Sequence, residues 1–413
     1  MMRGLLGIAA ILVFAWGLGE DRLRVPWRVV IAGVLLQFGL ALLFLKFPPA
    51  SAAFLLLNRG VEALQQATEA GTGFVFGYLG GGALPFAETR PGASFIFAFR
   101  ALPLVVLISA LATLLFYWGV LQRIVQAFAW VLRRSVGVGG PLGLGAVVHI
   151  FVGFIEAPLL IRPYLIRLER GELFALMSTG MAGIAGTVMV IYAALLRPVI
   201  PDALGNILIA AVISTPAALA IAALMVPFRP DPSPSAQLVM ADPPVSAMDA
   251  IAKGTGDGIV FFVNIIWMLV VLVALVSLVN SALGLLPDLF GAPVTLQRLF
   301  AYAFQPVMWL IGIPGPETAA AAALMGTKTV LNEFIAYVDF ANLPPDALSE
   351  RSRIIMTYAL CGFANFGSLG ILIGGMGAMV PERRPEIVAL GLRSILSGTL
   401  ATCMSGAVVA ILL

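Results

Sequence analysis

Two carboxylates lie inside apolar stretches of this 413-residue sequence, at matching distances from a repeated Leu-Gln-Arg. Glu156 follows Gln122 by 34 positions (156 minus 122), and Glu333 follows Gln297 by 36 (333 minus 297). A charged side chain near the middle of a bilayer costs about 2.5–3.5 kcal/mol on insertion scales, so such groups are usually retained for function. Their chemistry would be to accept hydrogen bonds from a polar solute or to carry a proton.

His149 is a further candidate for proton chemistry, because it is the one histidine in the chain and imidazole titrates near neutral pH. One histidine cannot supply the two or three clustered ligands of a zinc hydrolase, and no Gly-x-Ser-x-Gly turn accompanies it. Cys361 and Cys403 lie in separate apolar runs without disulfide or metal spacing. The sequence therefore predicts a protein that is not an enzyme and needs no metal or cofactor.

The composition is that of an integral membrane protein. Hydrophobic residues make up 61% of the chain and charged residues 11%, less than half the share typical of soluble domains. The length has room for about eight to ten spans of ~20 residues. The net charge of +3 comes from basic residues at segment ends, where lipid headgroups explain them without nucleic acid.

The near-equal spacing of the two carboxylates indicates a duplicated unit, as in many secondary transporters. We expect N-terminal spans and an interfacial helix over 1–92, a first repeat over 93–228, a linker over 229–246 and a second repeat over 247–413. Each repeat should contain a re-entrant hairpin, at about 139–168 and 313–340, and an interrupted span, at about 173–195 and 354–379. The predicted fold is an all-α polytopic membrane protein with inverted repeats.

Glycine and proline residues predict where the helices turn or unwind. Pro158 should turn the chain back and place Glu156 near a hairpin tip, and Gly183 should lie in an unwound segment. The glycines of 71–82 should break regular structure. Amphipathic or charged stretches at 51–68, 121–136 and 248–258 should lie in the interface, with a separate span over 259–285.

Spans at 4–18 and 27–47 are expected on either side of a short basic loop. By the positive-inside rule this loop is cytoplasmic and the N-terminus outside.

Several motifs, in order along the chain, resemble those of the concentrative nucleoside transporters. The matching segments are Phe97-Ala98-Phe99 with Leu102-Pro103, Leu115 to Gly119, Glu156-Ala157-Pro158 to Tyr164, Gly326-Thr327-Lys328, Asn332-Glu333-Phe334 to Tyr337, and Cys361-Gly362-Phe363-Ala364-Asn365-Phe366-Gly367-Ser368. The resemblance covers most of the chain. It implies a homotrimer in a bacterial inner membrane, with a substrate site in each protomer and elevator-like movement driven by a sodium or proton gradient.

The resemblance also implies a substrate site. Glu333, Asn365 and Ser368 would hold ribose hydroxyls, while Phe363 and Val188 would shape the base pocket. Glu156 belongs to the same site through the first hairpin. Phe154 and Ile155 stand where the family has Gln and Thr, so they would line a less polar base pocket that selects more broadly.

Coupling is the second departure from the family. Sodium-coupled members place Asn and Ser where this chain has His149 and Gly183, so two oxygen ligands for a hard cation are missing. We expect proton coupling through His149 or Glu156. Sodium coupling through backbone oxygens, or a channel or substrate-sensing protein on the same scaffold, are the alternatives. Lys328 is expected either to pair with Glu333 or to extend toward the interface.

Overall fold

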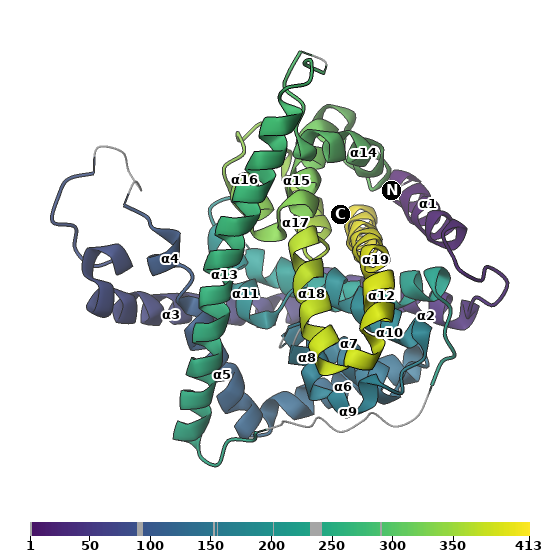
Figure 1. Ribbon diagram of the computed structural model, residues 1–413, viewed down its shortest axis with the longest axis horizontal. Coiled ribbons are helices and arrows are strands. Elements are labelled where there is room, and N and C mark those ends of the chain that lie inside the picture. Colours follow the sequence, from purple (N-terminus) through teal and green to yellow (C-terminus); the bar gives the residue numbers. More distant parts are fainter. Residues whose placement is uncertain are drawn as a thin grey trace.

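The computed structural model describes residues 2–88, 94–151, 153–154, 156–200, 202–231, 242–289 and 291–413, which form helices joined by loops (Figure 1). Within these residues, five helical stretches are long and apolar enough to cross a membrane: Trp27–Lys46, Phe97–Tyr117, Ala203–Met225, Ala247–Leu283 and Pro381–Leu412. The predicted all-helical fold with membrane-capable helices is confirmed. The predicted first span forms the shorter apolar helix α1 (Met2–Gly17), and other predicted spans are divided into pairs of short helices.

The N-terminal helices pack on the middle of the molecule. Helices α1 and α2 (Trp27–Lys46) both contact α12 (Ala203–Met225) and α19 (Arg384–Leu412). Helix α12 is almost wholly buried, because it is surrounded by α2, α10, α17 and α19. Helix α3 (Pro48–Phe76) continues through the predicted break at 71–76, and regular α-structure ends at Gly77, where φ is +60°. The short 3₁₀ helix η1 (Gly77–Gly80) follows.

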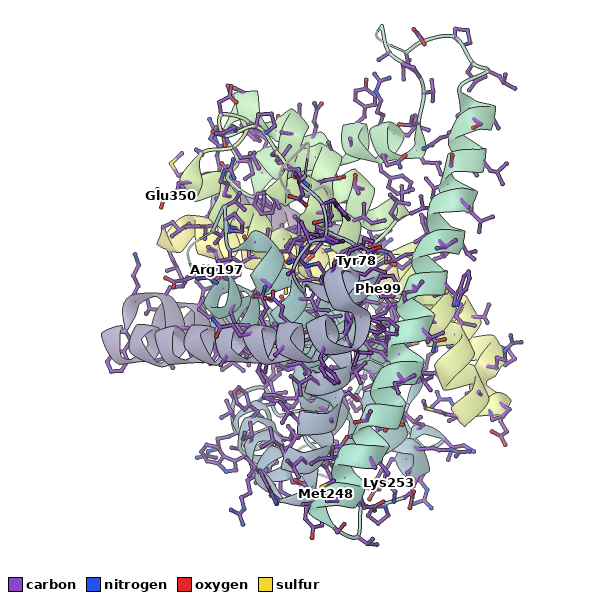
Figure 2. All side chains as sticks on the ribbon, turned by 90° about the vertical axis from the view of Figure 1, so that its left-hand side faces the viewer. Tyr78, Phe99, Arg197, Met248, Lys253 and Glu350 are labelled. Atoms are coloured by element: carbon purple, nitrogen blue, oxygen red, sulfur yellow. The ribbon has the colours of Figure 1, made fainter. Side chains whose placement is uncertain are left out.

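Helix α13 (Ala247–Leu283) is a single element, so the separate interfacial helix predicted over 248–258 is wrong. Figure 2 shows Met248 and Lys253 near one end of this long helix. Its glycines are contact points and not breaks: a Cβ on Gly254 would lie 2.7 Å from Ala110 Cα of α5 (Leu104–Tyr117). Close packing along α5, which follows the short helix α4 (Phe97–Arg100), keeps α13 continuous.

A similar order of helices then occurs twice, with α9 as an addition in the first copy and η2 and η3 as additions in the second. The first copy comprises α6 (Val120–Ser135), α7 (Gly140–Phe151), α8 (Glu156–Leu160), α9 (Arg162–Leu165), α10 (Arg170–Ala182), α11 (Gly186–Leu196) and α12. The second comprises α14 (Leu296–Leu310), η2 (Gly315–Glu317), α15 (Thr318–Val330), α16 (Glu333–Ala341), α17 (Glu350–Leu360), α18 (Phe366–Met379), η3 (Pro381–Arg383) and α19. The part of the predicted linker at 232–241 lies outside the described residues.

The helix break in the first copy comes earlier than predicted. Helix α7 ends at Phe151 and α8 begins at Glu156, so the break lies before Pro158. Pro158 is the third residue of α8, where its missing N–H would have no helical partner in any case. Pro158 is therefore compatible with the first turn of α8 and is not the residue that ends α7.

Two interrupted helix pairs meet inside the molecule. Helix α10 ends at Ala182 and α11 starts at Gly186, while α17 ends at Leu360 and α18 starts at Phe366. The Phe363 N–H donates to the Gly183 carbonyl at 3.1 Å. Backbone groups freed by one interruption are thus satisfied by the other, as burial requires.

Candidate functional site

A cavity of about 270 Å³ lies beside the two interruptions. Its wall is mostly apolar and includes residues of α11, α13, the start of α16 and the segment leading into α18. The lining consists of Leu102, Gly153, Phe154, Ala185, Val188, Ile191, Tyr192, Phe261, Asn264, Ile265, Met268, Leu269, Leu272, Asn332, Glu333, Phe334, Phe363, Asn365, Gly367, Ser368 and Ile371. An apolar wall with a few convergent polar groups is the usual form of a small-molecule site.

Glu333 is the acidic group of this wall, and two neutral donors hold it. Its carboxylate accepts the Tyr192 hydroxyl at 2.6 Å on one oxygen and the Asn365 amide at 2.9 Å on the other. Asn332 precedes it as the N-cap of α16, with its side-chain oxygen accepting the Ile335 N–H at 2.9 Å. The carboxylate therefore lies at the positive end of a helix, which stabilises its charge.

Asn365 joins this carboxylate to the start of α18. Its side-chain oxygen accepts the Ser368 N–H at 2.7 Å and caps the helix, so its amide nitrogen is left to face Glu333. Ser368 lines the cavity from the first turn of α18. Carboxylate, amide and hydroxyl groups together can bind a solute with neighbouring hydroxyls.

Aromatic rings form a second part of the wall. The rings of Phe154 and Phe363 have centroids 4.9 Å apart and planes inclined at 46°. Val188 of α11 also lines the cavity. These three side chains offer an apolar surface of the kind that accepts a flat ring.

The structure brings six of the eight predicted substrate residues together in one wall: Phe154, Val188, Glu333, Phe363, Asn365 and Ser368. Ile155 lies outside the described residues. Glu156 is described only as the first residue of α8, and its side chain lies outside the described part of the chain. The contacts of both side chains stay predictions.

His149 lies behind the cavity wall and does not line it. The ring is 4% exposed, and its Nδ1 is 3.2 Å from the carbonyl oxygen of Gly153, which does line the cavity. Its Nε2 has no hydrogen-bond partner among the described residues. A Cβ on Gly180 would lie 3.1 Å both from this ring and from Phe154 Cβ, so α10 packs directly against the pair.

Lys328 takes neither of the two positions expected for it. It is fully buried, and its ammonium donates to the Ala359 carbonyl at 2.9 Å and to the Thr402 hydroxyl at 3.2 Å. Ala359 lies in the last turn of α17. The cation therefore links α15 to the carboxyl end of α17 and to α19, where the helix dipole favours positive charge.

The sequence analysis missed Tyr192 and Asn264, which also line the cavity. Tyr192 follows Val188 by four positions, so both lie on one face of α11, and this spacing could have identified it. Asn264 is the single strongly polar residue in the apolar run 259–276. That isolation was the available signal.

Comparison with known families matches most of the chain. Residues 6–79 match the Na+ dependent nucleoside transporter N-terminus, residues 98–199 the nucleoside recognition Gate, and residues 206–410 the Na+ dependent nucleoside transporter C-terminus.

Individual relatives agree with these matches. An uncharacterized transporter of Haemophilus influenzae is 34% identical over 99% of this chain and 97% of its own length. The nucleoside permease NupC of Helicobacter pylori is 30% identical over 97% of this chain and 95% of its own.

The fold is that of a solved transporter. The structure of CNTnw in an inward-facing substrate-bound state has a TM-score of 0.88 and 33% identity, covering 99% of this chain and 98% of that one. Substituted variants of CNTnw are also solved in outward-facing and intermediate states. These matches extend over nearly the whole length of transporters and permeases, none of them an enzyme, and the chain belongs to the concentrative nucleoside transporter family.

Proposed function

We propose that this protein imports nucleosides or nucleoside-like solutes across a bacterial inner membrane as a proton-coupled secondary transporter. The observation that carries the proposal is the Glu333 carboxylate in the cavity wall, held by Tyr192 and Asn365. Each oxygen has accepted one hydrogen bond and retains capacity for another. Vicinal ribose hydroxyls are donors that fit this capacity.

The rest of the wall favours a substrate with one polar and one flat apolar side. The base would lie against Phe154, Phe363 and Val188, while Ser368 and Asn365 contact the sugar. An apolar base pocket separates related substrates by roughly 10–200-fold, whereas hydrogen-bonded recognition reaches 10⁴-fold or more. We therefore expect several nucleosides to compete with similar strength.

Re-entrant hairpins, elevator movement and a homotrimer complete the proposal. The breaks between α7 and α8 and between α15 and α16 would be the two hairpin tips, and the interrupted helices would move with them. Helix α13 is exposed along most of its length and packs on α5, which suits a static scaffold that also faces neighbouring protomers. The inward-facing and outward-facing states of CNTnw support such movement by analogy.

Proton coupling rests on the surroundings of His149. At the two places where sodium-coupled members supply side-chain oxygens, this chain has an imidazole and Gly183, whose carbonyl already accepts the Phe363 N–H. The Nε2 atom, which has no hydrogen-bond partner among the described residues, would accept the proton. Sodium coupling is the second candidate, because two of the matching families are described as Na+ dependent.

Uptake of labelled uridine and adenosine into proteoliposomes tests the proposal, with sodium and proton gradients imposed separately. Accumulation driven by protons alone is the expected result, and His149→Ala should flatten its pH dependence. Accumulation that requires sodium would assign the second candidate. Saturable exchange of labelled for unlabelled solute distinguishes a carrier from a channel or a sensor.

The substrate site is tested by Glu333→Gln. This variant keeps the size of the side chain but loses the charge, so uptake should be abolished while the protein purifies normally. Glu350→Gln is the matched control, since Glu350 lies exposed at the start of α17 (Figure 2) and does not line the cavity. Normal uptake by Glu333→Gln would remove the ribose-binding assignment.

A further inference from the structure

Three arginines surround a second pocket, of about 480 Å³, that is separate from the substrate cavity. Arg28 comes from the first turn of α2, and Arg133 and Arg134 come from the last turn of α6. Helices α2 and α6 contact one another, and Gly137 and Pro230 complete the lining. The pocket thus brings together arginines from two helices, and two uncharged loop residues complete its wall.

The three arginines of this pocket have no ion-pair partner among the described residues. None of the described lining residues is acidic, and no hydrogen bond or ion pair joins the three guanidinium groups to another described residue. Other arginines of the chain donate to carbonyls or carboxylates, namely Arg170, Arg298, Arg351, Arg353, Arg383 and Arg393. Like charges held together repel, and an anion would remove that repulsion.

The pocket lies at the level where membrane and water meet. Trp27 precedes Arg28 and is 53% exposed, and Trp130 is 56% exposed about one turn before Arg134. Exposed tryptophans next to apolar helices mark the headgroup layer. Helix α6 is amphipathic, burying Val125, Ala129 and Leu132 on one face, as a helix lying in that layer would.

The membrane side of the pocket follows from its neighbours. Arg28 lies directly after the basic loop between α1 and α2, which contains Arg22 and Arg24. Basic loops of this kind face the cytoplasm. The cytoplasmic leaflet carries the anionic lipids that attract arginines.

We propose that Arg28, Arg133 and Arg134 bind the phosphate of an anionic phospholipid headgroup. Guanidinium groups match phosphate oxygens with paired hydrogen bonds, and three of them from two helices can surround one phosphate. The shared chemistry is that of any phosphate, but the flanking tryptophans favour a source in the bilayer. Binding there would fasten α2 to α6 and to the α6–α7 loop.

Native mass spectrometry of the detergent-purified protein tests this site, with phosphatidylglycerol, phosphatidylcholine and inorganic phosphate as probes. Arg28→Gln/Arg133→Gln/Arg134→Gln should bind phosphatidylglycerol at least about tenfold more weakly, given the contribution of each arginine near an anionic surface. Arg24→Gln/Arg123→Gln/Arg167→Gln removes the same charge from exposed positions outside the pocket and should bind nearly as the wild type does.

Three outcomes would overturn the proposal. Equal losses in both triple variants would indicate general surface attraction, and equal binding of phosphatidylglycerol and phosphatidylcholine would show no preference for charge. Binding of inorganic phosphate with the same arginine dependence, together with displacement of the lipid, would assign a soluble anion. If the first triple variant fails to fold, Arg134→Gln against Arg123→Gln makes the same comparison with one exposed arginine each.

Discussion

The Glu333 carboxyl group illustrates how neutral donors can hold an acidic side chain inside the protein. Among the described residues it is paired with no cation, and Tyr192 and Asn365 each donate one hydrogen bond to it. Neutral donors hold the carboxyl group in place and leave each oxygen able to accept a further hydrogen bond, whereas a lysine partner would occupy one of these positions. The nearby cation Lys328 is instead turned toward Ala359 and Thr402. Binding capacity at this residue therefore depends on its two partners.

Tyr192→Phe tests that dependence at the residue scale. The change removes the donor 2.6 Å from Glu333 and keeps the ring, so we expect KM for uridine uptake to rise about tenfold, from a loss of about 1.5 kcal/mol for one intramolecular hydrogen bond. Uptake kinetics in proteoliposomes measure it. Tyr358→Phe is the matched control, because that hydroxyl donates to Asn206 at 3.0 Å and does not line the cavity. Equal KM values in the two variants would contradict the positioning role.

Lys328→Met tests the buried cation. The methionine has a similar length but cannot donate, so the Ala359 carbonyl loses its side-chain partner, at a cost of about 1–3 kcal/mol. Thermal unfolding in detergent should show a clearly lower Tm. Lys253→Met is the control, since that lysine forms only surface pairs with Asp242 and Asp249, which contribute little. An unchanged Tm in Lys328→Met would mean that the buried contacts are replaced without loss.

At the scale of elements, the interruptions could be predicted and the packing around them could not. Glycine content predicted interruptions within 173–195 and 354–379, and the structure has them between Ala182 and Gly186 and between Leu360 and Phe366. The interfacial helix predicted over 248–258 failed because Gly254 lies in close contact with α5 inside one continuous helix. Pro158 likewise starts a helix instead of ending one. A residue type indicates which backbone conformations are favoured. Which neighbouring helix packs against that residue depends on the tertiary fold.

The crossing of the two interrupted helices gives a prediction for Gly362→Ala. An added Cβ would lie 2.8 Å from Thr402 Cγ2 and 2.9 Å from the Met181 carbonyl oxygen, and the backbone has little room to move. We expect a lower Tm and loss of uptake, since over-packing typically costs about 1–3 kcal/mol and this site shapes the cavity. Gly370→Ala in α18 is the control, because nothing lies within 4 Å of its Cβ position. Full activity of Gly362→Ala would show that the crossing tolerates displacement.

At the scale of the whole molecule, ion pairs connect the two copies to the loop between the N-terminal helices α1 and α2. Glu20, in the loop after α1, accepts from Arg170 of α10 at 2.9 and 3.2 Å and also from Arg393 of α19. Arg170 in turn lies 3.6 Å from Glu386. This network connects three segments that are far apart in sequence. Motifs and spacing predicted each segment, but the pairing depends on how the helices assemble, which explains why the network was not predicted.

Glu20 therefore gives a prediction for the pH dependence of stability. The hydrogen bonds from Arg170, aided by the charges of Arg170 and Arg393, hold the pKa of the Glu20 carboxyl below its ordinary value of 4.5. A depressed pKa in the folded state contributes stability that is present above the unfolded value and is lost as pH falls through the folded one. The Tm in detergent should consequently fall as pH is lowered below about 4.5, and part of this fall should be absent in Glu20→Gln.

Asp21→Asn separates this network from a general effect of acid. Asp21 is the next residue and pairs only locally, with Arg24 at 3.4 Å, so its loss should leave the acid dependence of Tm as in the wild type. Because Glu20 joins helices of both copies to the N-terminal loop, Glu20→Gln should also lower Tm at neutral pH, where Asp21→Asn should not. Parallel pH curves for the wild type and Glu20→Gln would mean that the acid sensitivity arises from other carboxylates and that the three segments are held together by apolar packing alone.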